Sequence, residues 1–322
     1  MTIYNFGSIN LDHLYQLDHF VRPGETMASN SYQCLLGGKG ANQSVALAKA
    51  GARVKHVGAI HHSDQAIIKQ LESLGVDTDL INQIDVPTGH AIIQLNKEAE
   101  NSIILYQGAN HALTEEQVDQ VLSQATAGDW VLLQNETNLI EYTMRKAQEH
   151  GVKVAFNPAP MDAELTKKVL GFVDLLIVNE VEAMDLIGTS DIDSTIAAFP
   201  KAYPELAVLM TLGKAGVCYF SGKESDGKKS TGEEKLFVKA FSVKAVDTTA
   251  AGDTFIGFCL ASLMNGDDIA QSITRACAAS AICVTRLGAA SSIPTQDEVT
   301  AFLANKKFAN KKFANKEFAQ KS

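Results

Sequence analysis

The chain has 322 residues, of which 46% are hydrophobic and 20% are charged, so it is long enough to bury a large core as one domain or as two small ones. Its net charge of −9 argues against a general nucleic-acid binder, because phosphate contacts need a surplus of Lys and Arg on one face. There is no signal-peptide pattern, no apolar stretch of the roughly 20 residues that a membrane span needs, and no Cys-x-x-Cys pair. We therefore expect a cytoplasmic protein with reduced thiols that binds neither nucleic acid nor a membrane.

The segment Gly-Ser-Ile-Asn-Leu-Asp-His, residues 7–13, lies at the end of the first predicted strand. Open α/β sheets place their ligand-binding groups at this position. Asn10 and Asp12 carry oxygens that can bind adjacent hydroxyls of a sugar. An Asx turn that closes the strand is the alternative interpretation.

A glycine-rich segment, Gly-Gly-Lys-Gly-Ala-Asn-Gln at residues 37–43, precedes an amphipathic run at residues 44–51. Glycines at a strand-to-helix turn let backbone N–H groups approach a ligand, and Lys39 and Asn42 add side-chain donors. The segment is not a P-loop, because its Lys is not followed by Ser or Thr. By itself this turn does not identify a ligand.

The middle of the chain alternates between apolar strands and helices. Apolar β-branched runs predict strands at residues 130–133, 152–156, 175–178 and 206–210, with a helix near 138–150. Strands joined by crossover helices form parallel sheets with helices on both faces. We therefore predict an α/β fold with a doubly wound, mainly parallel sheet flanked by helices.

Several regions depart from this pattern. Residues from about 11–36 and 86–106 contain shorter, more polar alternating strands, which predict a small separate β-sheet. The polar residues 222–235 are typical of a solvated hairpin loop. The Lys/Phe repeat of residues 305–322 builds no continuous apolar helix face, so we expect a flexible tail, with a basic binding arm as the alternative. The remaining residues, 1–304, are expected to form one domain that includes the small sheet.

The segment Asp-Thr-Thr-Ala-Ala-Gly-Asp, residues 247–253, directly precedes an apolar helical run. A helix begins with unpaired N–H groups and the positive end of its dipole, and the small residues Ala250, Ala251 and Gly252 let a phosphate oxygen come close. Asp253 adds a carboxylate that can accept a proton beside that phosphate, as an enzyme that phosphorylates hydroxyls requires. The alternative is an ordinary helix start, where Asp stabilises the dipole.

Together these motifs resemble the ribokinase-like family of sugar and nucleoside kinases, from about Gly7 to Pro294. Residues 37–43 resemble its N-terminal signature and residues 247–255 its C-terminal one. Further matches are found at residues 108–110, 157–160, 179–182 and 211–216. The resemblance implies an ATP-dependent kinase that phosphorylates the primary hydroxyl of a pentose. Residues 7–12, 23–26 and 245–248 match the ribose-specific members best, so D-ribose is the expected substrate and D-ribose 5-phosphate the product.

The resemblance also implies a role for each matching residue. Asp253 would be the general base, and N–H groups of residues 250–253 would stabilise the transferred phosphoryl group. The sugar would be held by Asn10, Asp12, Gly38, Lys39, Gly40, Ala41, Asn42 and Glu136. ATP would contact Asn179, Thr211, Gly213, Lys214, Gly216, Gly252 and Cys277, and Glu182 would organise the waters of a bound Mg²⁺.

A monovalent cation such as K⁺ and a second copy of the chain are implied as well. The cation ligands would come from Asp247, Thr249, Cys283, Arg286, Gly288 and Ser292, which offer hard oxygen atoms. A plain helix C-cap is the alternative interpretation of residues 285–288. The small sheet would serve as a lid over the sugar, and its apolar face would pair with another copy to form a homodimer.

Other functions remain possible from the sequence. The same chemistry would also suit deoxyribose, fructose or a nucleoside, and a non-catalytic sugar-binding protein would share the fold. Asp253 and the intact small residues before it distinguish the kinase from the binding protein, because a pure binder does not need a base. A Rossmann oxidoreductase is disfavoured, because no Gly-x-Gly-x-x-Gly follows the first strand.

Overall fold

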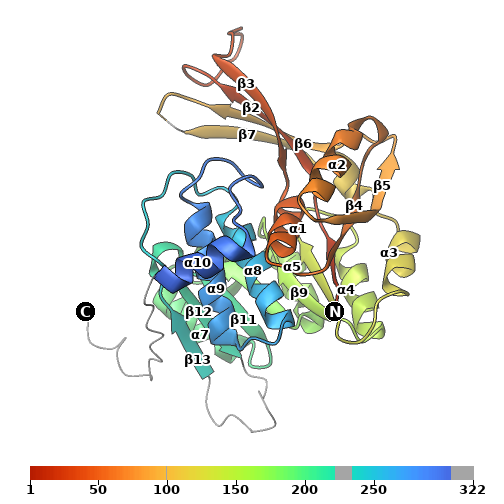
Figure 1. The fold of residues 1–322 in the computed structure, drawn as a ribbon, viewed down its shortest axis with the longest axis vertical. Helices are drawn as coiled ribbons and strands as arrows, with labels where there is room; N and C mark the ends of the chain where they lie inside the picture. The colour runs from red at the N-terminus through yellow and green to blue at the C-terminus, as the bar shows by residue number, and fades with distance from the viewer. Residues whose placement is uncertain (99, 222–233, 306–322) are drawn as a thin grey trace.

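In a computed structural model of the chain, residues 1–98, 100–221 and 234–305 are described. Most of them form a large body of strands and helices, from which a small second sheet projects (Figure 1). The predicted hairpin loop at residues 222–235 and the predicted tail at 305–322 lie almost wholly outside the described residues. Within the described ranges, no helix has both the length and the apolar character needed to cross a bilayer.

The body is built on a nine-stranded sheet with the strand order β13-β12-β11-β10-β9-β8-β1-β4-β5. Pairing is parallel from β5 to β11, whereas β12 and β13 are antiparallel. The bounds are β1 Ile3–Phe6, β4 Val54–His61, β5 Asp77–Ile84, β8 Trp130–Gln134, β9 Lys153–Asn157, β10 Leu175–Asn179, β11 Ala207–Thr211, β12 Val217–Ser221 and β13 Glu234–Val238. Strands β8 to β11 are the ones that the apolar runs predicted.

Helices cover both faces of this sheet. One face carries α1 Lys39–Lys49, α2 Gln65–Ser73, α8 Ala251–Met264, α9 Ile269–Cys283 and α10 Gln296–Asn305, which share one apolar core. The other face carries α3 Glu115–Leu122, α4 Ile140–Glu149, α5 Ala163–Val169, α6 Glu180–Ile187 and α7 Ile192–Ala202 around a second core. Short 3₁₀ turns lie at η1 His62–Asp64, η2 Gly108–His111, η3 Leu170–Phe172 and η4 Gly213–Ala215. The predicted doubly wound α/β fold is thereby confirmed.

The second sheet has four strands in the order β3-β2-β6-β7. Their bounds are β2 Asn10–Gln16, β3 Ser31–Gly37, β6 Gly89–Leu95 and β7 Asn101–Tyr106. Strand β2 pairs in parallel with β6, and the outer two pairings are antiparallel. All residues of β7 are exposed, and the sheet stands away from the body (Figure 1). A small separate sheet was predicted, and it is found.

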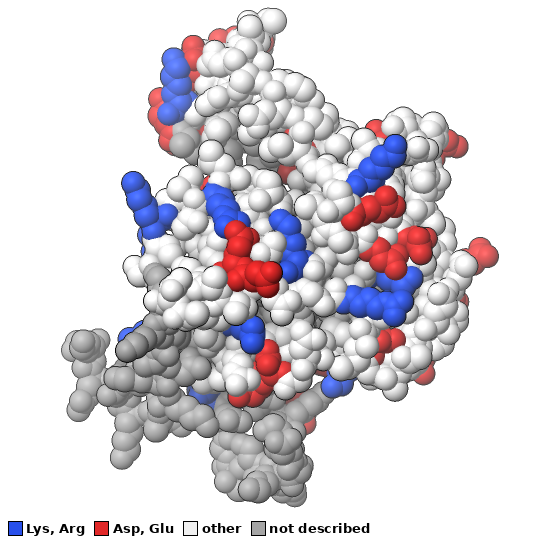
Figure 2. Space-filling view, in the orientation of Figure 1, with Lys and Arg blue, Asp and Glu red and all other residues white. Residues whose placement is uncertain are grey.

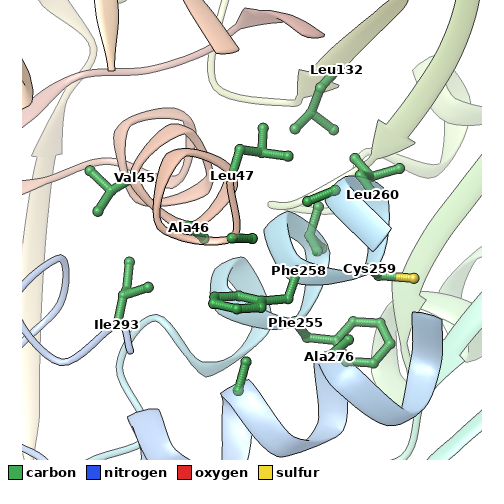
Figure 3. Packing of buried hydrophobic residues seen from close by; sticks show 14 of the residues in the cluster. Val45, Ala46, Leu47, Leu132, Phe255, Phe258, Cys259, Leu260, Ala276 and Ile293 are labelled. Carbon is green, nitrogen blue, oxygen red and sulfur yellow. The ribbon is translucent and has the colours of Figure 1, made fainter. Parts of the chain in front are cut away.

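Helices α1 and α8, which begin within the two signature segments, pack directly against each other (Figure 3). Gly257 makes this contact close, because a Cβ placed there would lie 2.4 Å from the Cβ of Ala46. Phe255 and Leu47 fill the surrounding core. The close contact lies one helical turn after Asn42 on α1 and after Asp253 on α8, so it holds the starts of the two helices together.

Candidate active site

The start of α8 presents unpaired backbone N–H groups. Ala250 precedes the helix at φ 57°, a left-handed conformation that is unusual for a residue with a Cβ. The N–H of Ala251 donates to the carbonyl of Thr248 at 3.2 Å, whereas the N–H groups of Gly252 and Asp253 have no acceptor among the described residues. Ala251 is therefore already paired, and the other two groups remain available to an anion at the positive end of the helix dipole.

The carboxylate of Asp253 is held by two amides from α1. Gln43 Nε2 donates to Oδ1 at 2.9 Å, and Asn42 Nδ2 donates to Oδ2 at 3.2 Å. Burial raises the pKa of Asp253, while Lys39 and the two amides act in the opposite direction. The oxygen of Asn42 is buried without a partner among the described residues, so it is free to accept a hydrogen bond from a ligand.

A second carboxylate, Glu136, follows β8 and is fixed from two sides. Its Oε2 accepts hydrogen bonds from the Ser8 hydroxyl and, at 3.1 Å, from the backbone N–H of Lys39. The N–H of Gly40 donates in turn to the Ser8 oxygen at 3.2 Å. A Cβ at Gly40 would lie 2.4 Å from the Cα of Gly7, so only glycine lets the first turn of α1 approach the end of β1.

The third carboxylate, Asp12, lies on β2 of the small sheet, within electrostatic reach of Glu136. A Cβ at Gly37 would lie 2.0 Å from its Oδ2, so the glycine makes room for the carboxylate. Burial, and after it the charge of Glu136, raises the pKa of Asp12 to about 6, and no described residue offers it a hydrogen bond. A partly buried carboxylate with a raised pKa and no partner is typical of a ligand-binding site.

Asn10 lies at the first position of β2, beside the 3₁₀ turn η2. Asn110 Nδ2 donates to Asn10 Oδ1 at 2.7 Å, and Asn110 Oδ1 accepts from the N–H of Ile9 at 2.8 Å. The Asx turn considered for this segment is therefore not formed at Asn10, because its oxygen pairs with a side chain far along the sequence. Both Asn10 and Asp12 lie on β2 of the small sheet, shortly after the main-sheet strand β1 ends at Phe6. Asp12 falls within the range 11–36 that was predicted for this sheet, whereas Asn10 was expected at the end of the first main-sheet strand.

A cavity of about 400 Å³ adjoins the start of α8. Of the residues expected to contact ATP, Thr211, Gly213, Lys214, Gly216, Gly252 and Cys277 line this cavity. Asn179 does not line it. Ala251, another predicted site residue, also lines it. The rest of the wall was not predicted and consists mainly of residues 240–243 after β13 and of Ala281 and Val284 at the C-terminal end of α9. The volume and the largely apolar lining suit a planar aromatic ring such as a nucleobase.

Asn179 and Glu182 form a capping box at the start of α6. Asn179 Oδ1 accepts from the N–H of Glu182 at 2.9 Å, and Glu182 Oε2 accepts from the N–H of Asn179 at 2.9 Å. Burial raises the pKa of Glu182, whereas the hydrogen bond from Asn179 and the charge of Lys39 lower it. The Asn-x-x-Glu motif therefore has a structural role that the sequence analysis did not consider.

The loop before α8 is joined to the segment after α9 through Asp247. Its Oδ1 accepts from the N–H of Thr249 at 2.9 Å and from the Thr249 hydroxyl at 2.7 Å, and its Oδ2 accepts from the N–H of Gly288 at 3.0 Å. Burial acts to raise the pKa of Asp247, but these hydrogen bonds hold it below its ordinary value. Gly288 is not a plain C-cap, because α9 ends at Cys283 and its C-cap is Val284.

The other expected cation ligands lie in the same two loops. Cys283 Sγ lies 3.7 Å from the carbonyl oxygen of Thr249 and 3.1 Å from the hydroxyl of Ser292. The carbonyl of Cys283 accepts from the N–H of Arg286 at 3.0 Å. These loops bring carbonyl, hydroxyl and carboxylate oxygens together, and such a donor set fits a hard cation. No group of three or more His, Cys, Asp or Glu side chains in the described ranges is arranged to hold a metal ion.

Several polar residues of the site have no assigned role in the sequence analysis. Ser8 bridges Glu136 and the first turn of α1, and Asn110 donates a hydrogen bond to Asn10. Gln43 and Gln134 are fully buried beside Asp253 and at the end of β8, respectively. The available signal was a polar residue within an apolar run, as in Trp-Val-Leu-Leu-Gln of β8, because a buried amide needs a partner.

Comparison with known proteins places these features in a family context. Residues 3–296 match the model of the pfkB family carbohydrate kinases. The chain is 39% identical over 313 residues to ribokinase of Haemophilus influenzae, covering 94% of this chain and 98% of that protein. It is 29% identical to deoxyribokinase of Salmonella typhi, covering 94% and 99%. The structure of Arabidopsis thaliana ribokinase complexed with ribose and ATP matches with a TM-score of 0.83 at 29% identity, covering 96% and 99%.

Proposed function

This chain belongs to the pfkB family of carbohydrate kinases, and we propose that it transfers the γ-phosphoryl group of ATP to the primary hydroxyl of D-ribose, giving D-ribose 5-phosphate. The observation that carries the proposal is the place of Asp253, in the first turn of α8 between the apolar cavity and the region of Glu136. The similarity to an Arabidopsis ribokinase with ribose and ATP bound supports the choice of substrates.

Asp253 is the general base of the proposed reaction. Its Oδ2 has the longer hydrogen bond, 3.2 Å from Asn42, so this oxygen is the one that exchanges its partner for the sugar hydroxyl. The ionised carboxylate takes the proton of the hydroxyl while the hydroxyl oxygen bonds to the γ-phosphorus and the bond to the bridging oxygen of ATP breaks. The N–H groups of Gly252 and Asp253, at the end of the segment 250–253, stabilise the charge on the transferred group.

Residues beneath the small sheet hold the sugar in this proposal. Asp12, Glu136 and the oxygen of Asn42 accept hydrogen bonds from ring hydroxyls, while Asn10 and the turn of residues 38–41 fix its orientation. A sugar that lacks one hydroxyl leaves a buried acceptor unpaired, which disfavours deoxyribose. The small sheet, built from about 11–36 and 86–106 within the 1–304 domain, acts as a lid that excludes water.

The nucleotide occupies the cavity beside α8. There Cys277 and Gly213 contact the nucleobase and the ribose of ATP, and Lys214 lies near its phosphates. We assign Mg²⁺ to the side of Glu182, whose Oε1 has no partner among the described residues while Oε2 closes the capping box. A bound Mg²⁺ would neutralise part of the phosphate charge. Asn179 contributes indirectly, because its cap fixes the position of Glu182.

We assign a monovalent cation such as K⁺ to the loops that Asp247 joins. The oxygens of Thr249, Cys283, Arg286, Gly288 and Ser292 complete the proposed ligand set. A bound cation would fix the loop that ends at Ala250 and therefore the direction in which α8 begins.

A homodimer through the lids is the proposed assembly. Large apolar side chains are exposed on the lid at Tyr32, Leu35, Ile92, Ile103, Ile104, Leu105 and Tyr106. An exposed apolar patch of this kind marks an interaction site, and an open sheet edge strengthens the case. Ile104→Asp is therefore expected to convert the dimer to a monomer in analytical ultracentrifugation, and an unchanged sedimentation coefficient would contradict the assignment.

The surface and the cysteines suggest no further partner class. Acidic and basic side chains are interspersed on the face seen in Figure 2, without a broad patch of one sign. Together with the net charge of −9, this gives no support to a nucleic-acid partner. The five cysteines are free thiols, which fits our placement of the protein in the reducing cytoplasm, where ATP is available.

The test is coupled ADP release with ATP and Mg²⁺ in the presence of ribose, deoxyribose, fructose or nucleosides, each with and without K⁺. Ribose-dependent turnover that exceeds turnover of deoxyribose and rises with K⁺ is expected. Preference for another sugar would transfer the proposal to that substrate. Ribose binding without turnover in calorimetry would instead favour the non-catalytic sugar-binding function.

A further inference from the structure

The side chain of Gln43 makes a hydrogen bond to the proposed base, Asp253, but none to a residue assigned to the sugar or the nucleotide. Its side chain is 0% exposed, and it makes hydrogen bonds to Asp253, Asn157 and Gln134. We propose that Gln43 is a positioning residue for the base: a chain of buried amides compels it to donate to Oδ1 of Asp253 and so reserves Oδ2 for the proton of the substrate. This inference rests on the proposed role of Asp253.

One end of the amide chain is anchored on a backbone carbonyl. Asn5 Nδ2 donates to the carbonyl of Gly40 and to the Ser44 hydroxyl oxygen, both at 2.8 Å. A carbonyl can only accept, so Asn5 Oδ1 must face the other way as an acceptor. Gln134 Nε2 donates to this oxygen at 3.0 Å and to Gln43 Oε1 at 2.7 Å, which uses both hydrogens of the Gln134 amide. The oxygen of Gln43 is thereby committed as an acceptor.

The other end of the chain gives the same orientation independently. Asn157 Nδ2 donates to the carbonyl of Ile177 at 3.0 Å, so Asn157 Oδ1 is an acceptor as well. Gln43 Nε2 lies 3.2 Å from that oxygen and 2.9 Å from Asp253 Oδ1, and its two hydrogens satisfy both. Turning the Gln43 amide over would set oxygen against oxygen at Asn157 and at Asp253. The direction of donation toward the base is therefore fixed from two sides.

A buried histidine, His56, also fixes the direction of the hydrogen bonds in this chain of amides. His56 Nε2 lies 3.0 Å from the carbonyl of Gly7, so it carries the proton, and His56 Nδ1 accepts from the Ser44 hydroxyl at 2.8 Å. Burial lowers the pKa of His56 to about 4, which keeps the ring neutral at neutral pH. The neutral ring leaves the Ser44 oxygen free to accept from Asn5, so the chain keeps one direction across the working pH range.

The arrangement has a consequence for the ionisation of the base. Around Asp253, Lys39 and the amides of Gln43 and Asn42 favour the charged carboxylate, whereas burial and the charge of Glu136 oppose it. Glu182 is a further acid within electrostatic reach of Asp253. Loss of the Gln43 donor therefore raises the pKa of Asp253, and it also removes the partner that holds Oδ1 away from the substrate. The remaining Asn42 amide is then free to pair with either oxygen.

Gln43→Met keeps the length of the side chain and removes the donor. We expect kcat with ribose to fall about ten- to hundred-fold, the range for a hydrogen bond to a charged group, with KM for ribose and for ATP changed less than about threefold. The acid limb of the kcat profile should move to higher pH, because the ionised Asp253 has lost a donor. Gln134→Leu, which does not touch Asp253, should produce a smaller change of both quantities in the same direction.

Gln117→Met is the matched control. Gln117 is a buried amide that donates to the carbonyls of Gly58 and Leu80 at 3.5 and 3.4 Å, away from the base. Gln117→Met should lower the unfolding free energy, yet leave kcat and the acid limb of its pH profile unchanged. If Gln43→Met retains the wild-type kcat and acid limb, or loses kcat to the same extent as Gln117→Met with no movement of the limb, the positioning role is refuted.

A second measurement does not depend on turnover. In chemical denaturation, the loss of unfolding free energy in Gln43→Met should grow as the pH rises and Asp253 ionises, because the ionised carboxylate has lost a partner, whereas the loss in Gln117→Met should stay constant. A constant loss in both variants would refute the inference even if the wild type is active. Wild-type protein without turnover on any sugar would refute the proposed function, while a growing loss would still support the link between Gln43 and Asp253.

Discussion

Replacing Asp12 by Asn is expected to make the protein more stable while weakening its hold on the sugar. Burial and the charge of Glu136 raise the pKa of Asp12 from 3.8 to about 6, so the folded state binds this proton more tightly than the unfolded chain does. Well below pH 3.8 the side chain is protonated in both states, and the folded state bears no cost. As the pH rises through 6 the folded state comes to bear the full cost of the buried charge.

The magnitude follows from the size of this shift. A shift of about two pH units corresponds to about 3 kcal/mol, and partial exposure of the side chain reduces it to about 2 kcal/mol. Asp12→Asn removes the charge and keeps the shape, so at pH 8 it should gain about 2 kcal/mol of unfolding free energy, or about 3 °C in Tm for a chain of this length. The gain should disappear as the pH falls toward 4. KM for ribose should rise about tenfold or more, because an acceptor of hydroxyl hydrogen bonds is lost.

The assay is thermal melting of both proteins from pH 4 to pH 8, with ribose kinetics at the upper end. Asp79→Asn, which removes a carboxylate from an exposed position on β5, is the control and should leave Tm and KM nearly unchanged. A Tm difference for Asp12→Asn that does not grow with pH would refute the electrostatic reasoning. An unchanged KM for ribose would refute the assignment of Asp12 to the sugar.

Two further substitutions test how the helices and the cavity support the site. Gly257→Val places a side chain against Ala46, so it should cost about 1–3 kcal/mol of unfolding free energy, measured by thermal melting. It should also lower kcat, measured by ADP release, because it separates the starts of α1 and α8. Gly171→Ala, whose Cβ would meet no atom within 4 Å, should do neither, and equal losses in both would contradict this reasoning. Cys277→Phe should fill part of the nucleotide cavity and raise KM for ATP about tenfold with little change in KM for ribose, and a selective loss of ribose binding would place the nucleotide elsewhere.

The features that could be predicted from the sequence are those that local chemistry decides. Strands β8 to β11 were predicted because each is an apolar β-branched run that ends where polarity returns. The helix that begins at Ala251 was predicted from small residues followed by an apolar run. The family resemblance added positions for Asn42, Glu136 and Asp253, and hydrogen bonds link them through neighbouring residues.

The features that could not be predicted depend on where distant segments meet. Asn10 was expected at the end of a main-sheet strand, but it begins a strand of the small sheet, where it pairs with Asn110. The orientation of Gln43 depends on carbonyls contributed by two other segments. No periodicity or motif in one segment contains that information.

The most direct test of the central claim is ribose-dependent ADP release by wild type and by Asp253→Asn, with ribose and ATP affinities of both proteins measured by calorimetry. We expect turnover by the wild type and a fall in kcat of about 10²–10⁴-fold in the variant, because an amide cannot take the proton of the hydroxyl. Both affinities should stay within about threefold, since Asn keeps the shape of the side chain. Wild type that does not phosphorylate ribose would contradict the proposed reaction, and a variant that phosphorylates it at the wild-type rate would contradict the role of Asp253 as the base.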